Sequence, residues 1–310
     1  MMKRNGLRTI NLDRYRSAQF WRDTARAYLY LLPAIVVLGT FTFYPFVKAF
    51  WISFYHWRLR NPVFIGWENY VRIFHDDLFW LSLWHTVYYV LGSVIPTMTL
   101  AMFIAVLLNS KIRGRSFFRT AFFLPYITNT VAASMVFLWI YDRDYGLLNY
   151  FLHTLFHVRL IDWLNTPQFA MPAVILMGIW RFLGFDVVIF LAGLQSIDKT
   201  YYEAAEVDGA TGWSRFRHIT VPLLSPTTFF VFIISIIGAF KVFQEIFILW
   251  SGPSGGPLHA AMTMMIYFYN TSWGEWHLGR GAAVANILFV IIFIITLIQM
   301  RLSKRWVFYQ

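Results

Sequence analysis

The residues of this chain best suited to chemistry are ionisable side chains that interrupt long apolar stretches. Arg181 and Asp186 lie within one such stretch, and Lys241 and Glu245 lie within another. Ionisable groups in apolar segments are costly to bury, so they tend to face a water-filled cavity or an oppositely charged partner. The chemistry that this pattern favours is the binding of a polar solute by charge and hydrogen bonding.

Lys241, Gln244 and Glu245 have a spacing of three and four residues, so we expect them on one face of a helix. That face is a candidate lining for a hydrated cavity. The alternative is an internal Lys241–Glu245 ion pair that neutralises itself. For Arg181, one role is to bind a phosphate or carboxylate of the solute. The other role, which the sequence favours slightly, is to reach toward the outer interface.

A second polar group lies in residues 195–226, which have the pattern of a helix, a turn and a second helix. Thr200 and Glu203 have capping-box spacing, with Asp198 as a competing cap. Gly209 suits the left-handed position that ends a helix. Thr211 can begin a second short helix, and Pro222 and Pro226 forbid its smooth continuation.

The first of these helices is acidic, with Glu203, Glu206 and Asp208. A lipid-binding helix favours a polar face rich in Lys and Arg. Ala204 and Ala205 are small enough to allow close approach of another protein. Docking into a basic groove of a partner protein is therefore the better physical interpretation of this segment, and completion of a helix cap is the simpler role for Glu203.

The sequence lacks the motifs of several classes of catalytic and metal-binding site. No Gly-x-x-x-x-Gly-Lys-Ser/Thr loop occurs, so we expect any ATP to be hydrolysed by another subunit. Residues 252–256 match a nucleophile-elbow pattern, but they lack the strand and helix that such an elbow needs. The eight histidines show no metal-ligand spacing, and there are no cysteines. We expect the chain not to be an enzyme.

The helices that hold these residues are expected to span a membrane. The chain is 58% hydrophobic and 13% charged, whereas a soluble domain has roughly a quarter charged residues. A membrane helix needs about 20 apolar residues. The sequence predicts an all-α membrane protein with six such spans, at residues 29–47, 81–108, 120–141, 169–194, 227–250 and 282–300.

The distribution of Lys and Arg predicts the orientation of these spans. Most of them fall in residues 1–27, 109–119, 195–226 and 301–310, which the positive-inside rule assigns to the cytoplasm. The net charge of +11 thus indicates topology, and nucleic-acid binding is the poor alternative. We expect a cytoplasmic tail (1–27), a first span with an external loop (28–80), a transport core (81–301) and a cytoplasmic C-terminal tail (302–310).

One run of residues is specific enough to indicate a family. It comprises Leu191–Gln195, Tyr202–Ala205, Gly209, Ile219, Pro222 and Pro226. The run resembles the signature loop of ABC importer permeases, in particular the carbohydrate-uptake branch with its maltose-type and glycerol-3-phosphate-type members. The resemblance extends to Gly66–Tyr70, Leu124–Pro125 and Gly146–Asn149. The fold that it implies is a type-1 permease core in spans two to six.

The resemblance also implies partners and roles. A coupling helix with Glu203, Ala204, Ala205, Asp208 and Gly209, followed by Ile219 and Pro222, would sit in a cleft of a separate ATPase. Two ATPase copies would hold ATP and magnesium, and no cofactor would bind this chain. A second homologous permease and an extracytoplasmic solute-binding protein would complete an alternating-access importer in the bacterial cytoplasmic membrane.

By the same resemblance, Gly184, Asp186, Lys241 and Gln244 would line the solute pathway, together with Glu245 and Arg181. The family usually has neutral amides where Lys241 and Glu245 stand, so this chain departs from the pattern there. The implied solute is a disaccharide or oligosaccharide, and a phosphorylated polyol such as glycerol-3-phosphate is the alternative. A membrane-embedded enzyme or a passive channel is the rival class, but a channel would not need an acidic docking loop.

Overall fold

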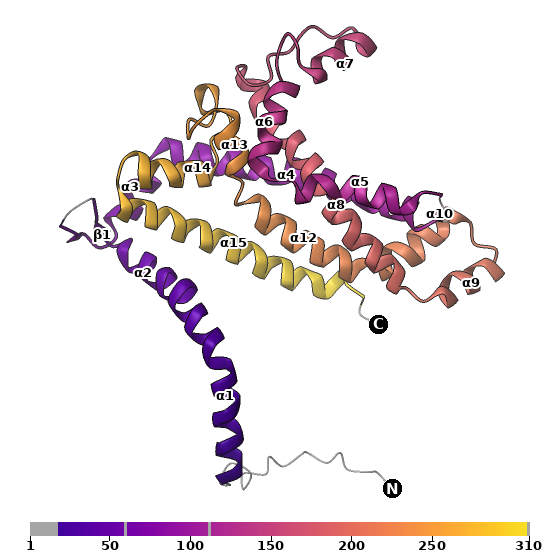
Figure 1. Ribbon diagram of the computed structural model, residues 1–310, viewed down its shortest axis with the longest axis horizontal. Coiled ribbons are helices and arrows are strands. Elements are labelled where there is room, and N and C mark those ends of the chain that lie inside the picture. Colours follow the sequence, from indigo (N-terminus) through magenta and orange to yellow (C-terminus); the bar gives the residue numbers. More distant parts are fainter. Residues whose placement is uncertain (1–17, 59–60, 111–112, 309–310) are drawn as a thin grey trace. The chain divides into compact units, whose positions relative to one another are not determined.

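The computed structural model describes residues 18–58, 61–110 and 113–308, and the chain divides into two compact units, residues 1–52 and 53–310. In the first unit, α1 (Ala18–Leu38), the π-helical turn η2 (Gly39–Phe43) and α2 (Tyr44–Ile52) follow one another as a single helical rod (Figure 1). Its apolar side chains are largely exposed within the unit, as a membrane helix requires. Most of the predicted tail 1–27 lies outside the described residues.

The second unit is built around two long helices that pack along one another, α4 (Asp77–Asn109) and α8 (Pro167–Ser196). The contact is close because small residues such as Ala101 and Ala105 are fully buried in it. Small residues allow helix backbones to approach in a membrane, where dispersion contacts replace the hydrophobic effect. Prolines at 96 and 172 are accommodated inside these helices.

The long helix α15 and a set of shorter elements surround this pair (Figure 1). They are β1 (Tyr55–His56), β2 (Val63–Phe64), α3 (Glu68–Phe74), α5 (Arg115–Ile127), α6 (Thr130–Ile140), α7 (Leu147–Phe156), α9 (Lys199–Val207), α10 (Gly212–Arg215), the π turn η3 (Phe216–Thr220), α11 (Val221–Leu223), α12 (Ser225–Ala239), α13 (Gln244–Leu249), the 3₁₀ turn η4 (Pro257–His259), α14 (Met264–Tyr269), the π turn η5 (Asn270–Gly274) and α15 (Leu278–Trp306). The two strands form an antiparallel hairpin.

In the described part of the chain, four helices are long and apolar enough to cross a membrane, and up to six crossings result if each of two bent helix pairs is one span. The predicted span 120–141 is wrong as a continuous helix, because α5 and α6 meet at 99°. Thr128 is extended, and the Asn129 side chain accepts from the amides of Val131 at 2.9 Å and Ala132 at 3.4 Å. Asn129 therefore caps a new helix and ends the old one.

The predicted span 227–250 is also wrong as one helix. The helix α12 ends at Ala239, and α13 begins at Gln244 after an unwound segment. At the junction, Phe243 has φ −148° and ψ −58°, which breaks the helical ladder. The Val242 carbonyl that this break releases accepts from the Thr263 hydroxyl at 3.2 Å. Broken helices are tolerated at membrane depth where such partners satisfy the backbone.

Several helix ends meet at one end of the second unit (Figure 1). The C-terminal segment reaches the start of α12, where the Phe308 amide donates to the Ser225 hydroxyl at 2.9 Å. Gln195 lies near the end of α8, and Arg115 and Arg119 lie on α5. With the side-chain oxygen of Gln195 turned toward these arginines, it accepts from Arg119 at 2.9 Å and from Arg115. The ends of α8 and α15 thus lie with the starts of α5 and α12, as alternating membrane crossings require.

Candidate functional site

The acidic segment forms a helical hairpin, residues 198–223, at this same end of the unit. Its first helix, α9, is capped by Asp198, whose carboxylate accepts from the Thr200 amide at 2.9 Å. The predicted cap at Thr200 is therefore wrong, and the competing residue holds that position. Hydrogen bonds from the backbone and side chain of Thr200 lower the pKa of the Asp198 carboxyl.

The turn of the hairpin has the predicted geometry. Gly209 has φ +72°, a left-handed conformation that glycine adopts without strain. Asp208 ends α9, and the Ala210 amide donates to the Ala205 carbonyl at 2.8 Å. Thr211 then caps the second helix, because its hydroxyl accepts from the Ser214 amide at 3.3 Å.

The second helix is longer than the sequence predicts. It continues through the π turn η3 and α11, past Pro222, and bends by 62° only at Leu224 before α12. A π turn pairs residues five apart. Pro222, which has no N–H to donate, follows directly in the first turn of α11, where a proline is tolerated.

Two polar contacts hold the legs of the hairpin together. The Tyr202 and Thr220 hydroxyls are 3.1 Å apart, and Arg215 Nη1 lies 3.4 Å from Glu206 Oε2. Glu203 and Ala204 remain exposed, whereas Ala205, Ile219 and Pro222 are half-buried. The hairpin is thus a braced projection with an acidic outer face, the shape that a docking element needs.

A cavity of about 320 Å³ lies at the break between α12 and α13. Residues from four parts of the chain line it, among them Tyr89, Arg181, Lys241, Gln244 and Glu245. Four of the predicted pathway residues therefore meet in one place. They do so through a break in the helix and not through the helical spacing on which the prediction was based.

The charges in this cavity pair differently from the prediction. Arg181 Nη1 donates to Glu245 Oε1 in an ion pair whose side chains are 17% and 6% exposed, respectively. The predicted alternative of a Lys241–Glu245 pair is wrong, since Glu245 is engaged by Arg181 from α8. The prediction that Arg181 reaches toward the outer interface is also wrong, because its guanidinium is held in the cavity by the ion pair with Glu245.

A second cavity of about 170 Å³ adjoins the first, since Tyr89, Phe182 and Gly238 line both. Asp186 lines it with 1% of its surface exposed. Among the described residues, neither carboxylate oxygen forms a hydrogen bond of good geometry, although the Ser235 hydroxyl lines the same cavity and interacts with the carboxyl group. A buried carboxyl group whose hydrogen-bonding capacity is not filled is a candidate ligand contact.

Gly184 lines neither cavity. A Cβ atom at this position would meet the Phe122 carbonyl of α5, so the glycine permits close packing of α5 on α8. The structure thus gives Gly184 a packing role and leaves Asp186 as the pathway candidate of this stretch.

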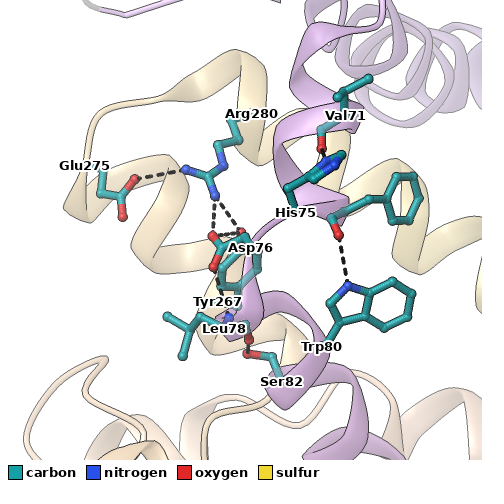
Figure 2. Close-up of polar contacts among 10 residues, drawn as sticks. Val71, His75, Asp76, Leu78, Trp80, Ser82, Tyr267, Glu275 and Arg280 are labelled. Atoms are coloured by element: carbon teal, nitrogen blue, oxygen red, sulfur yellow. Dashed lines mark hydrogen bonds and ion pairs between the residues drawn. The ribbon is translucent and has the colours of Figure 1, made fainter.

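A polar cluster that the sequence did not predict lies at the opposite end of the unit (Figures 1 and 2). Arg280 at the start of α15 forms an ion pair with Asp76, and the Tyr267 hydroxyl donates to the same carboxylate at 2.8 Å. Glu275 lies 3.9 Å from Arg280. The cluster borders an open cleft of about 990 Å³. No local signal links Asp76 to the other members, because 191 positions separate it from Tyr267 and 204 separate it from Arg280.

Comparison with known proteins identifies the class of the chain. The family model described as "Binding-protein-dependent transport system inner membrane component" matches residues 77–307. An arabinooligosaccharides transport system permease protein of Bacillus subtilis is 34% identical over 291 residues, which cover 91% of each chain. A lactose transport system permease protein of Rhizobium radiobacter is 32% identical over 300 residues, covering 95% of this chain and 97% of the relative.

A solved structure shares the fold. It is a bacterial ABC transporter involved in the import of the acidic polysaccharide alginate, with a TM-score of 0.81 and 24% identity over 93% of this chain and 99% of that one. The predictions of an ABC permease fold and of a permease that is not an enzyme are confirmed. The chain belongs to the family of binding-protein-dependent transport system inner membrane components.

Proposed function

We propose that the chain is a permease subunit of an ATP-driven importer for a disaccharide or oligosaccharide in the bacterial cytoplasmic membrane. Its relatives include permeases for arabinooligosaccharides, lactose, and trehalose or maltose, all of similar length. The cavities at the α12–α13 break form part of the solute pathway. They combine carboxyl, amide and hydroxyl groups with aromatic rings, which suits a sugar with many hydroxyl groups.

The proposed complex contains a second homologous permease, two ATPase copies that hold ATP and magnesium, and an extracytoplasmic solute-binding protein. A related solved structure is an alginate transporter in complex with a periplasmic protein bound to an alginate pentasaccharide. In this assembly, closure of the ATPases rocks the permeases from an inward-open to an outward-open state. Both chain ends, and the hairpin 198–223, face the cytoplasm.

The observation that carries this proposal is the braced hairpin with its exposed acidic face. Tyr202 and Glu206 are tied to the second leg, so a push on α9 is transmitted to α12 instead of being lost in a loose loop. Glu203 is free to pair with a basic residue of an ATPase. Force therefore reaches the segment beside the cavities through continuous helical structure.

The test is charge reversal at Glu203 with a matched conservative control. In the reconstituted complex, Glu203→Arg should abolish sugar uptake. It should also weaken binding of the ATPase, so that more ATPase is lost during purification. Glu203→Asp should retain both sugar uptake and ATPase binding. Membrane insertion of both variants should equal that of the unmodified chain. Unimpaired uptake by Glu203→Arg, with the ATPase still bound, would refute the assigned docking role.

A further inference from the structure

We infer that the transported saccharide carries one anionic group, a carboxylate or a phosphate, and that the Lys241 ammonium binds it in the cavity beside α13. The inference rests on the proposed function and adds the charge of the substrate. Lys241 lies two residues after Ala239, the last residue of α12, and lines this cavity.

The balance of charge in the cavity is the first argument. Arg181 and Glu245 neutralise each other in their ion pair, and both are largely buried. Lys241 lines the same cavity, and no carboxylate of the described residues lies within ion-pair distance of its ammonium group. The cavity of about 320 Å³ therefore carries one positive charge that this chain does not compensate.

The backbone explains why Lys241 faces the cavity. Its neighbour Val242 is buried, with its carbonyl bonded to Thr263, so the two successive residues of the unwound segment point in different directions. The side chain of Lys241 is exposed to the cavity instead of being packed among the helices. The Lys241 side chain is thus presented to the cavity from the unwound segment that follows α12.

An uncompensated charge at membrane depth is costly, and a solute of opposite charge relieves that cost. A neutral sugar would leave the ammonium group unpaired as the cavity loses water around the bound solute. A carboxylate or phosphate would form a charge-assisted hydrogen bond with it. A like-charged solute would be rejected by repulsion, so Lys241 also contributes to specificity.

The adjoining cavity accounts for the rest of the saccharide. Asp186 lies there with Ser235, near Tyr126 and Phe185, whose rings stack at 4.6 Å. Its carboxyl group can accept from sugar hydroxyls, and the aromatic rings offer an apolar surface to a sugar ring. Asp186 and Lys241 line adjoining cavities and form no ion pair with each other in the described part of the chain, so each can contact a different part of one saccharide.

The experiment uses the complete transporter with its binding protein, reconstituted in liposomes. Uptake is measured for three saccharides of equal length: one neutral, one with a single uronic acid and one with a single phosphate. The unmodified complex should prefer an anionic saccharide. Lys241→Gln should lower the ratio of anionic to neutral uptake about tenfold, the effect of about 1.4 kcal/mol. Lys241→Arg should preserve the ratio, as should Lys304→Gln, which removes an exposed cation near the chain end.

The two arms with charged saccharides distinguish a carboxylate substrate from a phosphate substrate. Preference of the unmodified complex for the neutral saccharide would overturn the inference, and this measurement needs no variant. An unchanged uptake ratio in Lys241→Gln would also overturn it, since the binding protein is the same in both complexes. A complex that imports no saccharide of any kind would instead refute the proposed function.

Discussion

Asp76 and Arg280 form an ion pair that joins the start of α4 to the start of α15, although 204 positions separate them. The same carboxylate accepts from the Leu78 amide at 3.0 Å, which caps α4, and from the Tyr267 hydroxyl of α14 (Figure 2). One side chain therefore connects the starts of α4 and α15 with α14. The cluster lies at the end of the unit opposite the hairpin 198–223, so it anchors the helices there while the hairpin end is free to receive a partner.

Replacement of Asp76 should separate its role as the cap of α4 from its role in the ion pair with Arg280. Asp76→Asn keeps a good helix cap but loses the ion pair, which is partly exposed, and should lower the free energy of unfolding by about 1–3 kcal/mol. Asp76→Ala also loses the cap and should cost about 1 kcal/mol more. Thermal unfolding of the purified complex measures both effects.

The matched control is Glu68→Gln, which breaks the ion pair of Glu68 with Arg72 in α3. Both side chains of this pair are about half exposed, so the change should stay within about 1 kcal/mol. Equal destabilisation by Asp76→Ala and Asp76→Asn would show that the carboxylate does not act as a cap.

Gly184 offers a second test, because it distinguishes packing from solute contact. Gly184→Ala would press a methyl group against the α5 backbone at Phe122 and should destabilise the chain by about 1–3 kcal/mol. Gly238→Ala on α12 is the control, since nothing lies within 4 Å of the added methyl group. Thermal unfolding should shift for the first variant alone. A stable Gly184→Ala protein with impaired uptake would return Gly184 to the solute pathway.

The sequence predicts the local features of the hairpin well because they depend on neighbouring residues. The left-handed turn at Gly209 and the cap at Thr211 follow from short-range hydrogen bonding and backbone sterics. Short-range rules do not decide whether Asp198 or Thr200 caps α9, because both side chains suit a cap and only two positions separate them.

Features that depend on tertiary contacts could not be predicted in this way. An apolar stretch indicates membrane depth but not continuity, so the breaks at Asn129 and Phe243 are invisible to hydropathy. The partner of Glu245 was also missed. Helical spacing makes Lys241 the local partner, whereas the break in the helix separates the two and brings in Arg181 from α8.

The Asp198 cap should make α9 sensitive to pH. Its pKa is lowered in the folded chain, so the stabilisation is present above the ordinary range of an aspartate and is lost as the pH falls through the folded-state pKa. As the pH falls through this pKa, amide hydrogen exchange at the start of α9, corrected for intrinsic rates, should become several-fold faster. Asp198→Asn should retain the cap without this dependence on pH.

Asp208 is the internal comparison for this experiment, because it lies at the opposite end of the same helix. A negative charge at a helix C-terminus is unfavourable, so Asp208→Ala should leave exchange in α9 unchanged or slow it. If exchange were equally fast in Asp198→Ala and in the unmodified chain, the capping role would be excluded.

The absence of cysteine allows the orientation of the chain to be measured with single introduced thiols. Val207 on the hairpin and Tyr145 before α7 are 89% and 85% exposed, so intrinsic accessibility does not separate them. In intact cells, a membrane-impermeant maleimide should label Tyr145→Cys and should label Val207→Cys only after the membrane is permeabilised. In the assembled importer, a bound ATPase should also slow labelling of Val207→Cys, since α9 would lie in its cleft. Rapid labelling of Val207→Cys from outside would place the acidic hairpin on the wrong side of the membrane for any contact with an ATPase, and the proposed coupling would then be untenable.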